Sequence, residues 1–140
     1  MNEYIYLIAP FSGWVVAQTI KFVLTLRKDG IRLSDAVQSG GMPSSHAAFM
    51  AALTTVIGLE LGATDPIFGL AVAATAIVLY DAAGVRQTTG QQTQAIKELA
   101  KGQSNKLKSS IQDARGHTIV EVAAGVLVGV VTGLTLNTVL

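Results

Sequence analysis

Apolar residues in this chain gather into four long stretches separated by polar segments. The stretches cover residues 4–26, 46–61, 66–85 and 117–140. A helix needs about 20 mainly apolar residues, with a range of about 17 to 25, to cross a bilayer. The first, third and fourth stretches reach that length, and the second is shorter. Clean alternation of apolar and polar residues, as in strands, is absent from the sequence. The pattern predicts an all-α polytopic membrane protein, a bundle of about four transmembrane helices with a polar cytoplasmic loop.

The composition agrees with this prediction. Of the 140 residues, 50% are hydrophobic and 14% are charged, whereas soluble domains carry about 25% charged residues. The length suits one domain, so we expect residues 1–140 to form a single membrane domain. The chain has no cysteine, which excludes disulfides and a cysteine nucleophile. Its basic residues have no interleaved aromatic residues, so nucleic acid is not expected as a partner.

The basic residues predict how the bundle is oriented. All ten fall on one side of a four-helix bundle: Lys21, Arg27, Lys28, Arg32, Arg86, Lys97, Lys101, Lys106, Lys108 and Arg115. Lys and Arg near helix ends stay in the cytoplasm. We therefore expect a multi-pass protein of the cell (plasma) membrane, with the polar loops in the cytoplasm and both termini outside.

The second polar segment, 86–116, carries apolar residues at helical spacing. Ile96, Leu99, Leu107 and Ile111 predict short amphipathic helices that lie at the membrane surface. The lysines of this segment predict a solvated face near lipid headgroups. A role for residues 87–115 as a lid over the bundle stays open.

Polar side chains from all four stretches fall at the basic side of the predicted bundle. They are Lys21, Ser44, Ser45, His46, Asp81, Arg86, His117 and Glu121. Ionisable residues within membrane helices are costly and usually functional. A four-helix bundle can aim such groups at one point. The sequence therefore predicts one polar site at this side of the bundle, which would be the cytoplasmic side.

The residue types in this site suit a phosphate group. Helix N-termini bind phosphate through free N–H groups, and Lys21 and Arg86 would add positive charge. His117 and Glu121 are four residues apart and share a helix face. Glu121 could then hold one ring nitrogen of His117 and leave the other free for nucleophilic attack. His46 could protonate a leaving oxygen as general acid.

Three motifs are similar to those of a known superfamily. They are GGMPSSHAA (40–48), YDAAGVRQTTGQQ (80–92) and GHTIVEVAAGVLVG (116–129). With Lys21, they resemble the divergent small membrane branch of the phosphatidic acid phosphatase type 2 and vanadium haloperoxidase superfamily, often labelled acid phosphatase/vanadium-dependent haloperoxidase-related. The resemblance covers nearly the whole chain. It implies a metal-independent lipid phosphate phosphatase without a cofactor.

The resemblance also implies roles for individual residues. Phosphate would be bound by Lys21, Ser44, Ser45 and Arg86. His117 would be the nucleophile that forms a phospho-histidine, and Glu121 would be its partner. His46 would be the general acid.

Several positions depart from the superfamily pattern. Ser45 replaces the usual Gly, and Glu121 replaces Asp. Arg86 lies about 30 residues before the histidine of its motif rather than a few. The first motif lacks its Arg-Pro pair, for which Arg27 and Arg32 are both candidates.

Each residue also has an interpretation without catalysis. His46 could cap a helix in a water-filled vestibule, and Lys21 could extend toward the headgroups. Glu121 would be favourable in any first helical turn. Arg86 could mark topology or pair with Asp81. The glycines at 125, 129 and 133 predict close packing on another helix, within the chain or across a homodimer.

Three functions follow as hypotheses. The first is hydrolysis of a phosphomonoester on a lipid headgroup, with phosphatidylglycerophosphate as the substrate that the resemblance implies. The second is a polyprenyl pyrophosphate phosphatase that uses the same site. The third is a non-catalytic membrane protein that binds phosphorylated lipid or anions.

Overall fold

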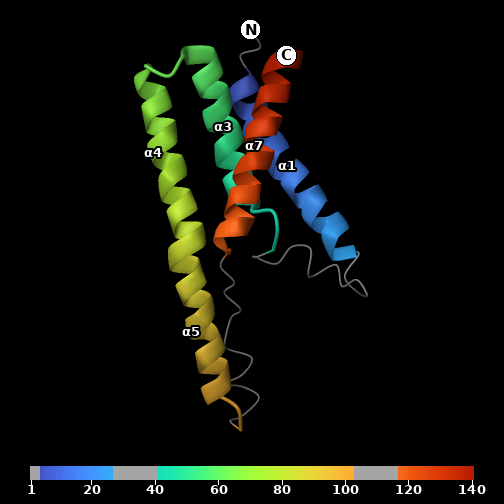
Figure 1. The fold of residues 1–140 in the computed structure, drawn as a ribbon, viewed down its shortest axis with the longest axis vertical. Coiled ribbons are helices and arrows are strands. Elements are labelled where there is room, and N and C mark those ends of the chain that lie inside the picture. The colour runs from blue at the N-terminus through green and yellow to red at the C-terminus, as the bar shows by residue number, and fades with distance from the viewer. Residues whose placement is uncertain (1–3, 27–40, 103–116) are drawn as a thin grey trace.

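The computed structural model describes residues 4–26, 41–102 and 117–140. These residues form helices and contain no strand (Figure 1). The elements are α1 (Ile5–Leu26), α3 (Ser45–Leu61), α4 (Pro66–Tyr80), the π-helix η1 (Asp81–Val85), α5 (Arg86–Leu99) and α7 (Ile119–Val139). The predicted all-α architecture is confirmed.

The described helices have the length and surface of membrane spans. Ile5–Leu26, Pro66–Leu99 and Ile119–Val139 are long and apolar enough to cross a bilayer, and α3 is a shorter apolar helix. Large apolar side chains point outward from these helices, among them Leu7, Leu70 and Leu127, each more than 60% exposed. Contiguous apolar surface of this kind is unfavourable in water and suits contact with lipid.

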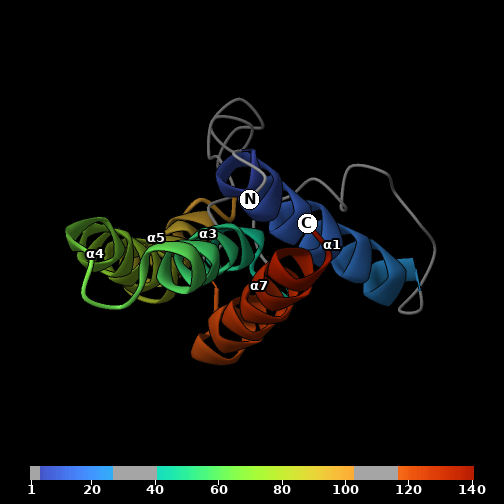
Figure 2. The same ribbon diagram turned by 90° about the horizontal axis from the view of Figure 1, so that it is seen from above.

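Helix α3 lies at the centre of the bundle and packs against α1, α4 and α7 (Figure 2). Small side chains allow three neighbours to approach it, since Ala47, Ala48, Ala51 and Ala52 are all buried. Small residues let helix backbones come close, which favours association of helices within a bilayer.

Helix α7 approaches α3 through its three glycines. A Cβ atom at Gly125 or Gly129 would overlap the carbonyl oxygen of Ser44 or Ala48, and one at Gly133 would lie 3.0 Å from the Ala52 carbonyl oxygen. The predicted close-packing face is therefore used within the chain. The homodimer stays a prediction.

The third helix is longer than predicted. It was expected to end at 85, but α4, η1 and α5 form one continuous helix over Pro66–Leu99 (Figure 1). The expectation of a short helix lying on the membrane surface is therefore wrong for residues 86–99, which continue along the axis of a membrane-spanning helix. Gln, Lys, Glu and Leu are good helix formers, and extending an existing helix is easier than nucleating another. Leu107 and Ile111 lie outside the described residues.

The two ends of the bundle differ in character. The start of α1, the link between α3 and α4 and the end of α7 lie at one end (Figure 1). The starts of α3 and α7 lie at the other end, from which α5 extends (Figure 1). The predicted polar site therefore falls on a single end of the bundle.

The contact between α3 and α7 predicts different outcomes for two glycine substitutions. Gly129→Ala should lower the free energy of unfolding by about 1–3 kcal/mol, the usual cost of overpacking, because its methyl group would overlap the Ala48 carbonyl oxygen. Gly69→Ala on α4 is the matched control, since nothing lies within 4 Å of its added methyl group. Thermal unfolding in one detergent compares the variants, and equal stability of both would contradict this packing.

Candidate active site

The turn that leads into α3 places two serines inside the protein. Gly41 has φ +86°, a left-handed conformation that glycine adopts readily. Ser44 is the N-cap of α3, and its hydroxyl oxygen accepts a hydrogen bond from the Ala47 N–H at 3.4 Å. Ser44 is fully buried, and Ser45 is 4% exposed. The Ala47 N–H is taken by this cap, but the N–H groups of Ser45 and His46 before it have no partner within the helix, so this turn can offer donors to an anion.

The start of α7 is fixed by a capping box. The Glu121 N–H donates to the Thr118 hydroxyl oxygen at 3.3 Å, and the Thr118 N–H donates to Glu121 Oε2 at 2.9 Å. This reciprocal pair satisfies two N–H groups at the helix start. Glu121 therefore stabilises the start of α7, in addition to any role in catalysis.

Backbone hydrogen bonds join three helices at this end. The Ser44 N–H donates to the Glu121 carbonyl oxygen at 2.9 Å, which ties the start of α3 to the first turn of α7. The His117 N–H donates to the Ala82 carbonyl oxygen of η1 at 3.1 Å. The position of His117 is thus fixed by the hydrogen bond of its own N–H group to η1, as well as by the start of α7 that follows it.

The His117 imidazole is 4% exposed, with Nδ1 3.5 Å from Glu121 Oε2. The two groups are close enough for an ion pair, but Nδ1 has no hydrogen-bond partner among the described residues. Burial lowers the pKa of His117 below its usual value, and the charges of Lys21 and His46 act in the same direction, while Glu121 opposes them. This shift favours the neutral form of the ring, which is the form that can act as a nucleophile.

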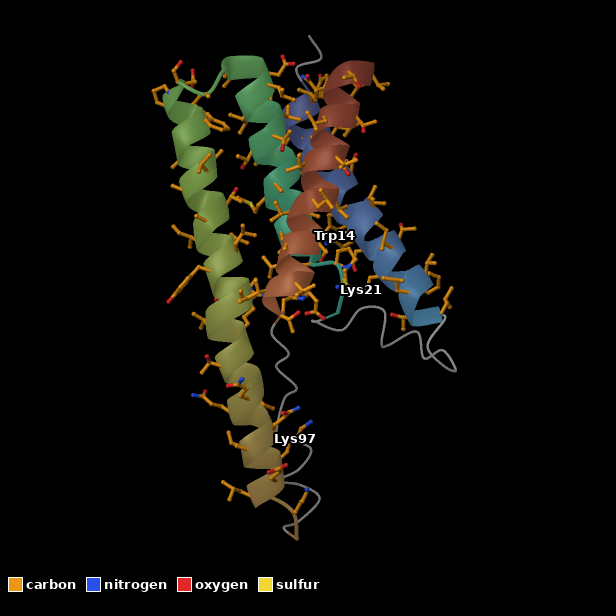
Figure 3. All side chains as sticks on the ribbon, viewed as in Figure 1. Trp14, Lys21 and Lys97 are labelled. Carbon is orange, nitrogen blue, oxygen red and sulfur yellow. The ribbon has the colours of Figure 1, made fainter. Side chains whose placement is uncertain are left out.

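Lys21 brings a positive charge into the interior of the bundle. Its side chain is 7% exposed and lies beside the turn that precedes α3 (Figure 3). A Cβ atom at Gly41 would be 3.8 Å from Lys21 Cδ. Among the described ranges, no carboxylate forms a salt bridge with the Lys21 ammonium group. A buried charge is costly without a partner, so this group suits an anionic ligand, and its burial argues against extension toward the headgroups.

His46 on α3 and Arg86 at the end of η1 are the remaining candidate residues of the site. The exposed His46 lies within the electrostatic reach of Lys21, Arg86 and Asp81, and its own charge acts on His117. Arg86 Nε is 2.7 Å from Asp81 Oδ2, and both side chains are nearly half exposed. The alternative in which Arg86 pairs with Asp81 is therefore realised.

The structure brings all the candidate residues to one end of the bundle. They are Lys21, Ser44, Ser45, His46, Arg86, His117 and Glu121. Their individual roles stay predictions. Arg27, Arg32 and residues 103–115 of the expected lid lie outside the described residues.

Two features of the site were missed in the sequence. Thr118 was not singled out, although Thr118 and Glu121 match the T-x-x-E pattern of a capping box. The π-helix has no comparable signal, because it depends on how the backbone of η1 meets the start of α7.

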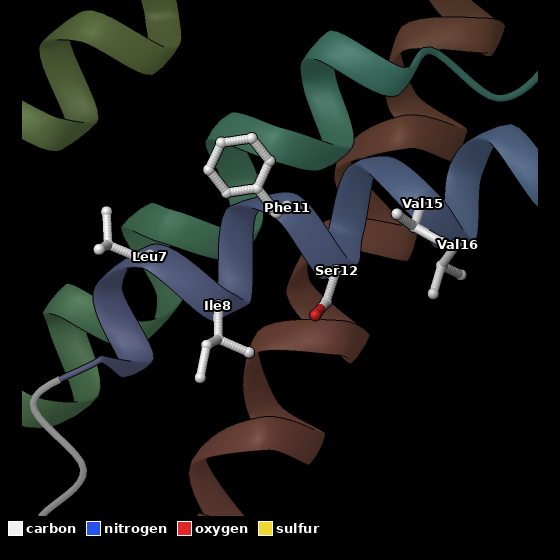
Figure 4. Close-up of a pocket in the computed structure, with 6 residues that line it drawn as sticks. All are labelled: Leu7, Ile8, Phe11, Ser12, Val15 and Val16. Carbon is white, nitrogen blue, oxygen red and sulfur yellow. The ribbon is translucent and has the colours of Figure 1, made fainter.

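A hollow of about 530 Å³ lies on the outer surface of α1, apart from this site (Figure 4). It is lined by Leu7, Ile8, Phe11, Ser12, Val15 and Val16. The lining contains no titratable side chain and suits contact with lipid rather than chemistry.

The capping box predicts a specific effect of losing one hydroxyl group. Thr118→Ala should lower the free energy of unfolding by about 1 kcal/mol, the usual value of an N-cap, whereas Thr118→Ser should retain it. Thr135→Ala, at an exposed position on the same helix, is the matched control. Thermal unfolding measures all three, and an alanine variant at 118 as stable as the serine variant would argue against the cap.

Comparison with known proteins gives two findings. A family model described as "Divergent PAP2 family" matches residues 2–132, which include every candidate site residue. The "Uncharacterized membrane protein YuiD" of Bacillus subtilis (strain 168) is 29% identical over 148 residues, covering 93% of this chain and 92% of that protein. No solved structure matches this chain.

Proposed function

The chain belongs to the divergent PAP2 family, and we propose that it is a membrane phosphatase that hydrolyses a phosphomonoester on a lipid headgroup. Family membership makes it a phosphatase-related membrane protein. The main support for hydrolysis of a lipid phosphomonoester is the buried Lys21 ammonium group. It lies beside the start of α3 and has no salt-bridge partner among the described residues.

Phosphate would be held between a helix start and two cations. The first turn of α3 offers the hydroxyl groups of Ser44 and Ser45, the Ser45 N–H and the positive end of a helix dipole. Lys21 supplies a point charge from α1, and Arg86 can hold two phosphate oxygens at once. This arrangement favours a dianionic phosphomonoester over a neutral or singly charged headgroup.

The reaction would proceed in two steps. His117 attacks phosphorus through Nε2, because Nδ1 faces Glu121. The bond from phosphorus to the lipid oxygen breaks, and that oxygen takes a proton from His46. Glu121 stabilises the positive charge that develops on the His117 ring. A water molecule then gives a proton to His46 and attacks phosphorus, the phosphorus–nitrogen bond breaks, and inorganic phosphate leaves.

The position of the site supports a lipid substrate. It lies at one end of a bundle whose sides are apolar, so a headgroup can enter while the acyl chains stay in the bilayer. Within this class, phosphatidylglycerophosphate is the substrate that we propose. The described basic residues lie toward the same end, which supports a plasma-membrane protein with its site on the cytoplasmic side and both termini outside.

Phosphate release by the purified protein in detergent tests this function. His117→Ala should lower turnover of phosphatidylglycerophosphate by about 10⁴-fold or more, the usual effect of removing a nucleophile. The exposed Thr135→Ala serves as the folded control. Full activity of the alanine variant at 117 would contradict the mechanism.

The same assay separates the alternatives. Faster release from an isoprenyl pyrophosphate would identify a polyprenyl pyrophosphate phosphatase instead. Binding of inorganic phosphate by the wild-type protein without turnover of either lipid would indicate a non-catalytic anion-binding protein.

A further inference from the structure

The helix that carries Arg86 changes its hydrogen-bond pattern beside the site. In an α-helix, the Arg86 N–H would donate to the carbonyl oxygen of Ala82, four residues earlier. In η1 it donates instead to the carbonyl oxygen of Asp81, five residues earlier. Single π-helical turns inside α-helices are rare and are frequent at functional sites.

This change releases the carbonyl group that holds His117. Because the Arg86 N–H is paired with Asp81, the Ala82 carbonyl oxygen is without its usual α-helical donor. It accepts the His117 N–H at 3.1 Å. The π-helical turn η1 therefore links the backbone of Arg86 to the backbone of His117, the proposed nucleophile, through hydrogen bonds.

The same turn aligns two side chains. Residues five apart in an α-helix point about 140° away from each other, because each residue adds about 100°. The i to i+5 backbone bond of η1 instead places Arg86 about one turn above Asp81. Arg86 Nε consequently donates to Asp81 Oδ2 at 2.7 Å.

The contact uses only one edge of the guanidinium group. Nε faces Asp81, and the two terminal nitrogens remain on the far edge. The His46 side chain lies within the electrostatic reach of Arg86. The Arg86 side chain is nearly half exposed, so these terminal nitrogens can reach a ligand.

We propose that Asp81 is a positioning residue that holds Arg86 so that its terminal nitrogens bind two oxygens of the substrate phosphate. This inference rests on the proposed function, since it assigns Arg86 to phosphate binding. An exposed arginine has many accessible side-chain conformations, and fixing one of them strengthens bidentate binding. Asp81 therefore acts on binding through Arg86 and does not touch the reacting atoms.

The experiment measures kcat and KM at a fixed detergent concentration for Asp81→Ala, Arg86→Ala and the double variant. Asp81→Ala should raise KM about tenfold, the scale of one hydrogen bond to a charged group, with kcat nearly unchanged. Asp81→Asn retains an oxygen acceptor and should fall between the wild-type protein and the alanine variant. The double variant should have the KM of Arg86→Ala, because Asp81 has no effect once its partner is absent.

Glu98→Ala is the matched control. It removes one negative charge from the same continuous helix at an exposed position, 12 residues beyond Arg86. Its KM should equal that of the wild-type protein. A control variant that raises KM as much as Asp81→Ala would show a general charge effect and overturn the proposal.

Binding of inorganic phosphate, measured by calorimetry on the same proteins, separates failure of this inference from failure of the proposed function. Active wild-type protein with an unchanged KM in Asp81→Ala would overturn the positioning role and leave the function intact. Wild-type protein that binds phosphate without turnover, with weaker binding in Asp81→Ala, would overturn the enzyme and support the positioning role. Absence of both turnover and phosphate binding would overturn both.

Discussion

The close approach of α3 and α7 is the contact on which the arrangement of the site depends. Three glycines of α7 face the backbone of α3, so the two helices pack with no side chain of α7 between them at those positions. At their starts, the Ser44 N–H can therefore reach the Glu121 carbonyl oxygen at 2.9 Å. Two helix N-termini are brought together at one end of an apolar bundle, where they form a region that favours negative charge.

The interior of this region holds positive charge in a protein that otherwise faces lipid. Lys21 is buried beside the turn before α3, and no carboxylate among the described residues forms a salt bridge with it. Its burial would be unfavourable in an empty apolar bundle. The charge of the Glu121 carboxylate acts favourably on Lys21 without forming a salt bridge with it, whereas the helix starts are themselves positive. The phosphate of the proposed substrate would satisfy the cation and both helix starts together.

Most of the fold could be predicted from the sequence, and so could the end of the bundle at which the candidate residues lie. The four apolar stretches located the helices to within a few residues, except at the end of the third helix. There, hydropathy falls after residue 85 while helix formation continues to Leu99. Hydropathy reports the surroundings of a segment, whereas helix continuation depends on backbone hydrogen bonds and propensity. The motifs around Ser44, Arg86 and His117 named side chains that the structure places at one end of the bundle, and their membership of a functional site stays a prediction.

The local chemistry of the site was harder to predict. The role of Ser44 as an N-cap and the reciprocal bonds of Thr118 follow from recognised patterns. The π-helical turn and its bond to the His117 N–H do not, because they arise where two distant segments meet. In the sequence, Arg86 lies about 30 residues before His117. Only the fold shows that the Ala82 carbonyl oxygen, on the turn before Arg86, accepts the His117 N–H.

Direct detection of a phospho-histidine tests the central claim most directly. Purified protein would be mixed with a phosphorylated lipid substrate and quenched at alkaline pH within one turnover, and its peptides would be examined by mass spectrometry. We expect phosphate on the peptide that contains His117, and none in the His117→Ala variant. Turnover of the lipid without phosphate on His117 at any time point, or with phosphate on another residue, would contradict the account.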